Sequence, residues 1–158
     1  MEKGKTQIRY YLAPAVVFAL AVGFMLWSRT PAKVPLRIET AEHSYNLLVD
    51  IAATPKEREK GLMGRAFLPE DEGMLLVYEH PGTPVLWMKN MVFPLDFVFI
   101  GSDQSVVEIK SKIPPCGTAD DLCPRYFPNH PARYVLELAG GFVEKYGIHL
   151  GDKISLEK

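Results

Sequence analysis

The chain has 158 residues, of which 47% are hydrophobic and 23% charged, and its formal net charge is −1. This length accommodates one folded domain and a short additional segment. The composition excludes disordered and fibrous proteins, and the charge balance argues against a strongly basic nucleic-acid-binding protein. Since no catalytic motif is complete, the sequence indicates location and architecture better than chemistry.

The first predicted element is an apolar segment near the N-terminus, Tyr10–Trp27. As a helix it would span about 27 Å at ~1.5 Å per residue, close to the ~30 Å hydrocarbon thickness of a bilayer. Three basic residues precede it, Lys3, Lys5 and Arg9, which by the positive-inside rule places the N-terminus in the cytoplasm. We therefore expect a single-pass anchor, residues 10–27, in a bacterial inner membrane, with the remaining chain in the periplasm.

A cleaved signal peptide is the alternative interpretation of this segment. Residues 19–21, Ala-Leu-Ala, are similar to a small-residue cleavage site, although the apolar or small residues 22–27 follow it and favour an anchor. After cleavage the protein would be released into the periplasm. In both cases residues 1–30 comprise the anchor or signal peptide and the start of a linker. Residues 31–158 then form a single soluble domain with 14 basic and 18 acidic residues, a net charge of −4.

Short strands and one helix are expected in the first half of this domain. Strands are predicted at Leu36–Thr40 and Leu47–Ala52, joined by a polar turn. Residues 54–57, Thr-Pro-Lys-Glu, mark a helix start, because threonine caps, proline takes the first helical position and glutamate completes a capping box. The helix is predicted to end near Gly61, and a further strand is expected at Gly73–Tyr78.

The second half continues the pattern of short strands. Further strands are predicted at Val85–Asn90, Leu95–Ile100, Ser105–Ile113, Arg133–Leu138 and Lys153–Leu156, with a helix over Gly140–Tyr146 that stops at Gly147. Together the elements predict an α+β fold with two short helices. Its sheet is expected to be mainly antiparallel and strongly twisted, or to close partly into a small barrel. A parallel nucleotide-binding sheet is disfavoured, because helices are few and no glycine-rich phosphate loop follows a strand.

The two cysteines of the chain, Cys116 and Cys123, lie in a loop rich in proline. Outside the cytoplasm such a close pair is typical of a disulfide, which would stabilise the loop by about 2.5 kcal/mol. A two-thiol metal site is the alternative, but the spacing is wider than usual and no histidine lies between the cysteines. Redox catalysis is disfavoured because the spacing is not Cys-x-x-Cys.

Polar residues inside an apolar stretch give the main candidates for a ligand-binding site. Residues 85–100 contain only three polar positions, Lys89, Asn90 and Asp96. A lysine or aspartate buried alone is costly, so each is expected to find a partner or to face a cleft. In a cleft, Trp87 would supply an apolar wall and the three polar residues its hydrogen bonds. The alternative is that Lys89 extends to water and Asp96 binds turn amides.

A second charged residue, Glu137, lies in the otherwise apolar strand predicted at Arg133–Leu138. It is either half-exposed or a second carboxylate beside Lys89. The four histidines are scattered and the methionines lie in apolar contexts typical of core residues, so no metal and no cofactor is predicted.

Several of these pieces occur together in one known family. The motifs are residues 57–63, Glu-Arg-Glu-Lys-Gly-Leu-Met, then Glu72–Leu75, Trp87–Asn90, Pro94–Asp96, Tyr134–Leu138, Gly147–Ile148 and Gly151–Asp152. In this order they resemble the domain of unknown function 192 family over about residues 36–157. The resemblance implies a small α+β domain of bacteria and archaea, often behind a signal or anchor. It carries over no catalytic role, but its motifs coincide with the Trp87 to Asp96 cluster.

Three functions follow from these patterns as hypotheses. The first is a membrane-anchored periplasmic binding module for a small molecule or an envelope component, with Trp87, Lys89, Asn90, Asp96 and Glu137 as candidate ligand-binding residues. The second is a hydrolase that uses Asp96 or Glu137 with Lys89. The third is an envelope assembly or interaction protein. No nucleic-acid partner is expected, since the folded domain is acidic.

Overall fold

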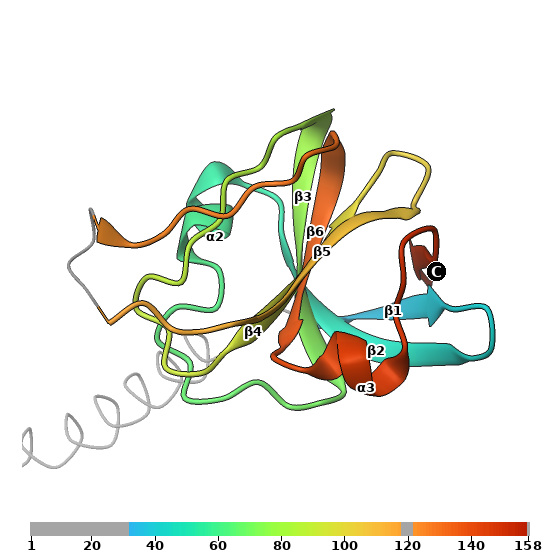
Figure 1. Ribbon diagram of the computed structural model, residues 1–158, viewed down its shortest axis with the longest axis horizontal. Helices are drawn as coiled ribbons and strands as arrows, with labels where there is room; N and C mark the ends of the chain where they lie inside the picture. The colour runs from blue at the N-terminus through green and yellow to red at the C-terminus, as the bar shows by residue number, and fades with distance from the viewer. Residues whose placement is uncertain (1–31, 118–121, 158) are drawn as a thin grey trace, which may run out of the picture. The chain divides into compact units, whose positions relative to one another are not determined.

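The computed structural model describes residues 32–117 and 122–157 (Figure 1). The predicted membrane segment, residues 10–27, lies outside these residues. Within the described ranges, no helix has both the length and the apolar character needed to cross a bilayer.

In the described part of the chain, seven strands form one sheet, and two short helices accompany it. The elements in chain order are β1 Val34–Glu39, β2 Ser44–Ala52, α2 Pro55–Lys60, β3 Glu72–Gly82, β4 Leu95–Ile100, β5 Val106–Ile113, β6 Ala132–Ala139, α3 Phe142–Tyr146 and β7 Lys153–Leu156. The strand order across the sheet is β5-β4-β6-β3-β2-β1-β7. The predicted α+β class with two short helices is therefore confirmed for the described residues.

The sheet is mixed rather than antiparallel, which corrects one part of the predicted fold. Strands β2 and β3 pair in parallel, with Val49 opposite Gly73, whereas the other neighbouring strands pair antiparallel. Parallel neighbours need a crossover connection, and residues 53–71, which contain α2, provide it. The helix predicted between these two strands is thus the element that makes them parallel.

The two edges of the sheet curl toward each other, so that the sheet forms a half-barrel. Ser105, immediately before β5, forms an isolated antiparallel bridge with Lys153 of β7. The Val106 N–H donates to the Asp152 carbonyl at 2.9 Å, and the Ile154 N–H donates to the Gln104 carbonyl at 2.9 Å. Of the two predicted forms, the partly closed barrel describes this arrangement better.

Alternation along the central strands divides the core between the two faces of the sheet. On β4, Val98 and Ile100 belong to a cluster that includes Phe142 and Val143 of α3. Phe97 of the same strand belongs to a second cluster, on the opposite face. This second cluster is covered by segments that follow α2 and β3, represented by Leu62, Leu68, Leu86, Met88 and Met91.

The helices lie in different parts of the domain. Figure 1 shows α2 among the long loops on the left and α3 at the bottom beside β2. The predicted capping box of α2 is present: the Glu57 N–H donates to the Thr54 hydroxyl at 3.3 Å, and the Thr54 N–H donates to the Glu57 carboxylate at 2.9 Å. No side chain of α2 is buried. This helix therefore contributes its ends and its charged side chains rather than a core face.

One predicted strand is wrong, and the predicted disulfide is confirmed. Residues 85–90 form no strand, because Leu86 makes only a single bridge, with Tyr126, and Asn90 turns the chain with φ of 55°. The segment therefore lies against the loop before β6 instead of joining the sheet. That loop contains the Cys116–Cys123 disulfide, with the two Cα atoms 5.7 Å apart.

Candidate functional site

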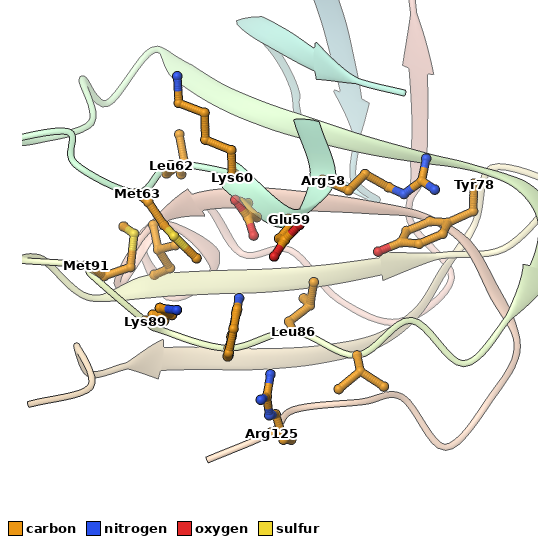
Figure 2. A pocket seen from close by; sticks show the side chains of 15 residues that line it. Arg58, Glu59, Lys60, Leu62, Met63, Tyr78, Leu86, Lys89, Met91 and Arg125 are labelled. Carbon is orange, nitrogen blue, oxygen red and sulfur yellow. The ribbon is translucent and has the colours of Figure 1, made fainter. Parts of the chain in front are cut away.

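A cavity of about 240 Å³ lies beside α2 (Figure 2). Its walls come from α2 and the residues after it, from Tyr78 of β3, from the segment 85–91, from Arg125 and from Glu137 of β6. Segments far apart in the sequence thus meet around one space. The charged residues that line the cavity are Arg58, Glu59, Lys60, Lys89, Arg125 and Glu137.

Glu137 provides a buried carboxyl group at this cavity. Its register on β6 places it opposite Met74 of β3 and Phe97 of β4, on the apolar face described above. The residue is only 6% exposed, and its Oε2 atom has no hydrogen-bond partner among the described residues. Burial raises the pKa of this carboxyl to about 7, although the Arg65 guanidinium opposes the shift. A buried carboxyl oxygen without a hydrogen-bond partner is costly for the folded state.

Gly61 keeps space open next to that carboxyl. It ends α2 with φ of +46°, and a Cβ atom built on it would lie 3.6 Å from Glu137 Oε2. A larger side chain would therefore strain the backbone and extend toward the carboxyl. The glycine that stops the helix is also the residue that leaves room above Glu137.

Trp87, Lys89 and Arg125 form the opposite, cationic wall. The Lys89 Nζ atom lies 4.9 Å and the Arg125 guanidinium carbon 4.0 Å from the centroid of the Trp87 ring. Both contacts are cation–π interactions, which hold the charges against an aromatic surface. Trp87 and Lys89 are half-buried, while the intervening Met88 is in the core. Half-buried and buried side chains therefore alternate along residues 87–89, as predicted, although the segment is not a strand.

Arg125 reaches the cavity because two connections hold its loop in place. The Leu86 N–H donates to the Tyr126 carbonyl at 2.8 Å, and the Tyr126 N–H donates back at 2.9 Å. The Cys116 N–H donates to the Met88 carbonyl at 3.1 Å, and Cys116 is joined by the disulfide to Cys123, just before Arg125. The disulfide thus fixes the loop that carries a cavity residue.

The side chains of α2 have different orientations. Figure 2 shows Glu59 pointing toward the cavity and Lys60 extending away from it. The Arg58 guanidinium donates to the carbonyls of Ala53 and Val77, and it lies 4.6 Å from the centroid of the Tyr78 ring. Burial raises the pKa of the Tyr78 hydroxyl, so this group stays neutral at physiological pH. Glu59 and Glu137 therefore form the acidic side of the cavity, facing Lys89 and Arg125.

Two of the predicted ligand-binding residues lie away from this cavity. Asp96 is fully buried, and its carboxylate accepts hydrogen bonds from the backbone N–H groups of Lys112, Gly141 and Val143 at 2.7, 3.0 and 2.8 Å. It therefore fixes the start of α3 to β5. Asp96 is paired with Leu138 across the sheet, so it faces the side opposite to Glu137. Asn90 is exposed and does not line the cavity.

Of the five residues predicted from the sequence, the structure brings together Trp87, Lys89 and Glu137. Sequence reasoning missed five polar residues at the cavity: Arg58, Glu59, Lys60, Tyr78 and Arg125. Glu59 belongs to a short charged helix that has no apolar face, and this pattern could have indicated that its side chains serve a site and not the core. Arg125 gave no local signal, because only the bridge and the disulfide bring it to Trp87. Among the described residues, no group of three or more metal-binding side chains is arranged to hold an ion.

Comparisons with known proteins agree with the fold and the motifs. The model of the family DUF192, described as an uncharacterized ACR, matches residues 36–156. A crystal structure at 1.55 Å of a Sinorhizobium meliloti 1021 protein, provisionally assigned as a transcription regulator, is 35% identical. The match covers 79% of this chain and 94% of that chain, with a TM-score of 0.73.

A second crystal structure, at 1.22 Å, is of a protein of unknown function from Novosphingobium aromaticivorans DSM 12444. It is 32% identical, with a TM-score of 0.73, and the match covers 78% of this chain and 84% of that one. The comparison with curated proteins gave no match. The family match over most of the chain establishes that this protein belongs to the DUF192 family.

Proposed function

We propose that this protein is a membrane-anchored periplasmic binding module, and that the cavity beside α2 holds a small molecule or a small part of an envelope component. The observation that carries the proposal is the buried carboxyl of Glu137, which lines the cavity and has an oxygen without a hydrogen-bond partner among the described residues. A ligand that satisfies this group removes the cost of burying it.

The composition of the cavity wall also supports a binding role. A few charged groups lie among apolar side chains such as Leu62, Met63, Leu86 and Met91, which is typical of small-ligand sites. Lys89 and Arg125 are held against Trp87, so they lose little conformational freedom when a ligand binds.

The predicted location rests on separate observations. The apolar segment 10–27 supports membrane attachment, and the Cys116–Cys123 disulfide supports an oxidising compartment. Fusion of alkaline phosphatase after Lys158 tests the orientation, because this reporter folds only outside the cytoplasm. Activity of the fusion in intact cells, in the membrane fraction, is the expected result. An inactive fusion, with both cysteines reduced, would contradict the location.

Ligand-detected NMR tests the binding role. The full chain in detergent micelles is mixed with periplasmic metabolites and soluble cell-wall fragments, and saturation transfer from protein to ligand is recorded. We expect at least one compound to respond, and we expect Trp87→Ala to remove the response. The control is Lys56→Gln, because Lys56 is exposed on α2 and does not line the cavity. A response that survives Trp87→Ala would place binding elsewhere, and no response at all would argue against the proposal.

A hydrolase is the second candidate, and one observation favours it. Glu137 has its pKa raised to about 7 at the cavity, which suits a general acid or base near neutral pH. Asp96 does not support this role, because three backbone N–H groups occupy its carboxylate on the other face of the sheet. Turnover of a compound found by NMR, lost in Glu137→Gln, would favour the hydrolase over the binding module.

A further inference from the structure

The charges around the cavity beside α2 are divided between two sides. Glu59 and Glu137 supply carboxyl groups on the side of α2 and β6, and Lys89 and Arg125 supply cations beside Trp87. Arg125 forms no ion pair with either glutamate within the described part of the chain, so the cavity keeps these groups apart. Arg125 therefore presents a charge that neither glutamate neutralises by contact.

A purely anionic ligand would satisfy Lys89 and Arg125 but would be repelled by Glu59. A purely cationic ligand would satisfy the two glutamates and be repelled by the opposite wall. A molecule with both charges satisfies both sides, because charge-assisted hydrogen bonds form at each end. The separation of charges in the cavity thus indicates a zwitterion.

The size and the apolar lining limit which zwitterions fit. A cavity of about 240 Å³ corresponds to about eight water volumes at ~30 Å³ each. Leu62, Met63, Leu86 and Met91 line it and provide contacts for an apolar side chain. An amino acid with an apolar side chain matches this volume, as does a small dipeptide.

We propose that the cavity binds a small zwitterion, an apolar amino acid or a dipeptide, with its ammonium group on Glu137 and Glu59 and its carboxylate on Arg125 and Lys89. This inference rests on the proposed binding function and names its ligand class. The carboxylate and the guanidinium can pair through two parallel hydrogen bonds. The ammonium supplies a donor for Glu137 Oε2, which has no hydrogen-bond partner among the described residues.

The ionisation of Glu137 gives this proposal a pH signature. An ammonium group favours the ionised carboxylate, so binding of leucine should become tighter as the pH rises through about 7. The charged and titratable groups around Glu137 and its cavity are Arg58, Glu59 and Lys60 of α2, Arg65, Tyr78, Lys89 and Arg125. No histidine lines the cavity within residues 32–117 and 122–157, and the pKa of Tyr78 is raised from an already high value.

The test uses the full chain in detergent micelles with Trp27→Phe, so that Trp87 is the only tryptophan. Trp87 fluorescence is titrated with leucine, methionine or alanyl-alanine. Two matched probes each lack one charge: 4-methylpentanoate has no ammonium and isoamylamine has no carboxylate. We expect a zwitterion to bind at least about tenfold more tightly than either probe, as one charge-assisted hydrogen bond implies. We also expect its binding to be about tenfold tighter at pH 8 than at pH 6.

Variants identify the two sides of the cavity. Arg125→Gln and Glu137→Gln should each weaken zwitterion binding about tenfold or more, and Glu137→Gln should also remove the pH dependence. Lys56→Gln makes the same charge change as Arg125→Gln at an exposed position of α2 outside the cavity, and it should bind as the parent does. Arg125 is exposed, so its replacement leaves the core intact.

The outcomes separate this inference from the broader function. Equal binding of 4-methylpentanoate and leucine, or unchanged binding in Arg125→Gln, would overturn the zwitterion class. Binding of glucose or glucuronate but of no zwitterion would also overturn it, while keeping the cavity as a binding site. No response to any of these probes would overturn the ligand class, and no response to the wider NMR panel either would overturn the binding function as well.

Discussion

Replacing Glu137 by glutamine should change how the stability of the domain depends on pH. The carboxyl is buried, and its pKa in the folded state is about 7, compared with 4.5 for the ordinary group. The folded state therefore holds the proton more tightly than the unfolded state, so the stability is greatest at low pH. It is lost progressively as the pH rises from about 4.5 through 7.

The magnitude follows from this difference in pKa. A shift of one unit corresponds to ~1.4 kcal/mol, and the part of the shift that falls between pH 5 and pH 8 amounts to about 2–3 kcal/mol. Glutamine cannot ionise, so the stability of Glu137→Gln should not show this loss. The variant should therefore become more stable relative to the parent by about 2–3 kcal/mol between pH 5 and pH 8.

Urea denaturation at a series of pH values, followed by Trp87 fluorescence in the Trp27→Phe background, measures the difference. Comparing the two proteins at each pH cancels the titration of the other groups. A difference between parent and variant that stays constant from pH 5 to pH 8 would refute the argument. Such a result would mean that Glu137 ionises normally in the folded protein.

Three further predictions concern the stability of the fold and of the loop that carries Arg125. Asp96→Ala should lower the free energy of unfolding by about 3 kcal/mol or more, because three backbone N–H groups lose a charged acceptor. Urea denaturation measures this loss, and a loss under about 1 kcal/mol would contradict the structural role of Asp96. Gly140→Ala should lower the free energy of unfolding by about 1–3 kcal/mol in the same assay, because the new Cβ atom would lie 2.8 Å from Pro94 Cβ. An unchanged free energy of unfolding would show that the contact relaxes easily. Reduction of the Cys116–Cys123 disulfide should lower the free energy of unfolding by about 2.5 kcal/mol, seen as a lower thermal midpoint, and should weaken ligand binding because it releases the loop that carries Arg125. Unchanged ligand affinity after reduction would show that the loop holds its position without the disulfide.

Local patterns in the sequence predicted much of the fold. The capping box at residues 54–57 identified the start of α2, and the close cysteine pair identified the disulfide, because both depend on neighbouring residues. The parallel pairing of β2 and β3 was missed, although the sequence contained a helix between two strands, which is what a parallel connection requires. Residues 85–90 were predicted as a strand from their apolar alternation. The same alternation also occurs in a segment that packs against a loop, as this one does.

The two buried carboxylates show where sequence reasoning ends. A carboxylate in an apolar stretch must either find partners or face a cleft, and Asp96 and Glu137 are equivalent by that criterion. The structure assigns one outcome to each: Asp96 accepts three backbone hydrogen bonds, and Glu137 faces the cavity. The strand register decides this, because Asp96 opposes Leu138 whereas Glu137 opposes Phe97, which places them on opposite faces. Register depends on the whole sheet and not on the local sequence.

The ionisation of Glu137 in the presence of ligand shows whether a ligand meets this carboxyl in the cavity. The side-chain carboxyl carbon of Glu137 can be followed by NMR in protein labelled with 13C-glutamate, with Glu137→Gln to assign the signal. We expect a midpoint of about 7 in the protein without ligand, and we expect it to move to lower pH when leucine saturates the cavity. A midpoint near 4.5 without ligand, or one that leucine at saturation leaves unchanged, would contradict this expectation.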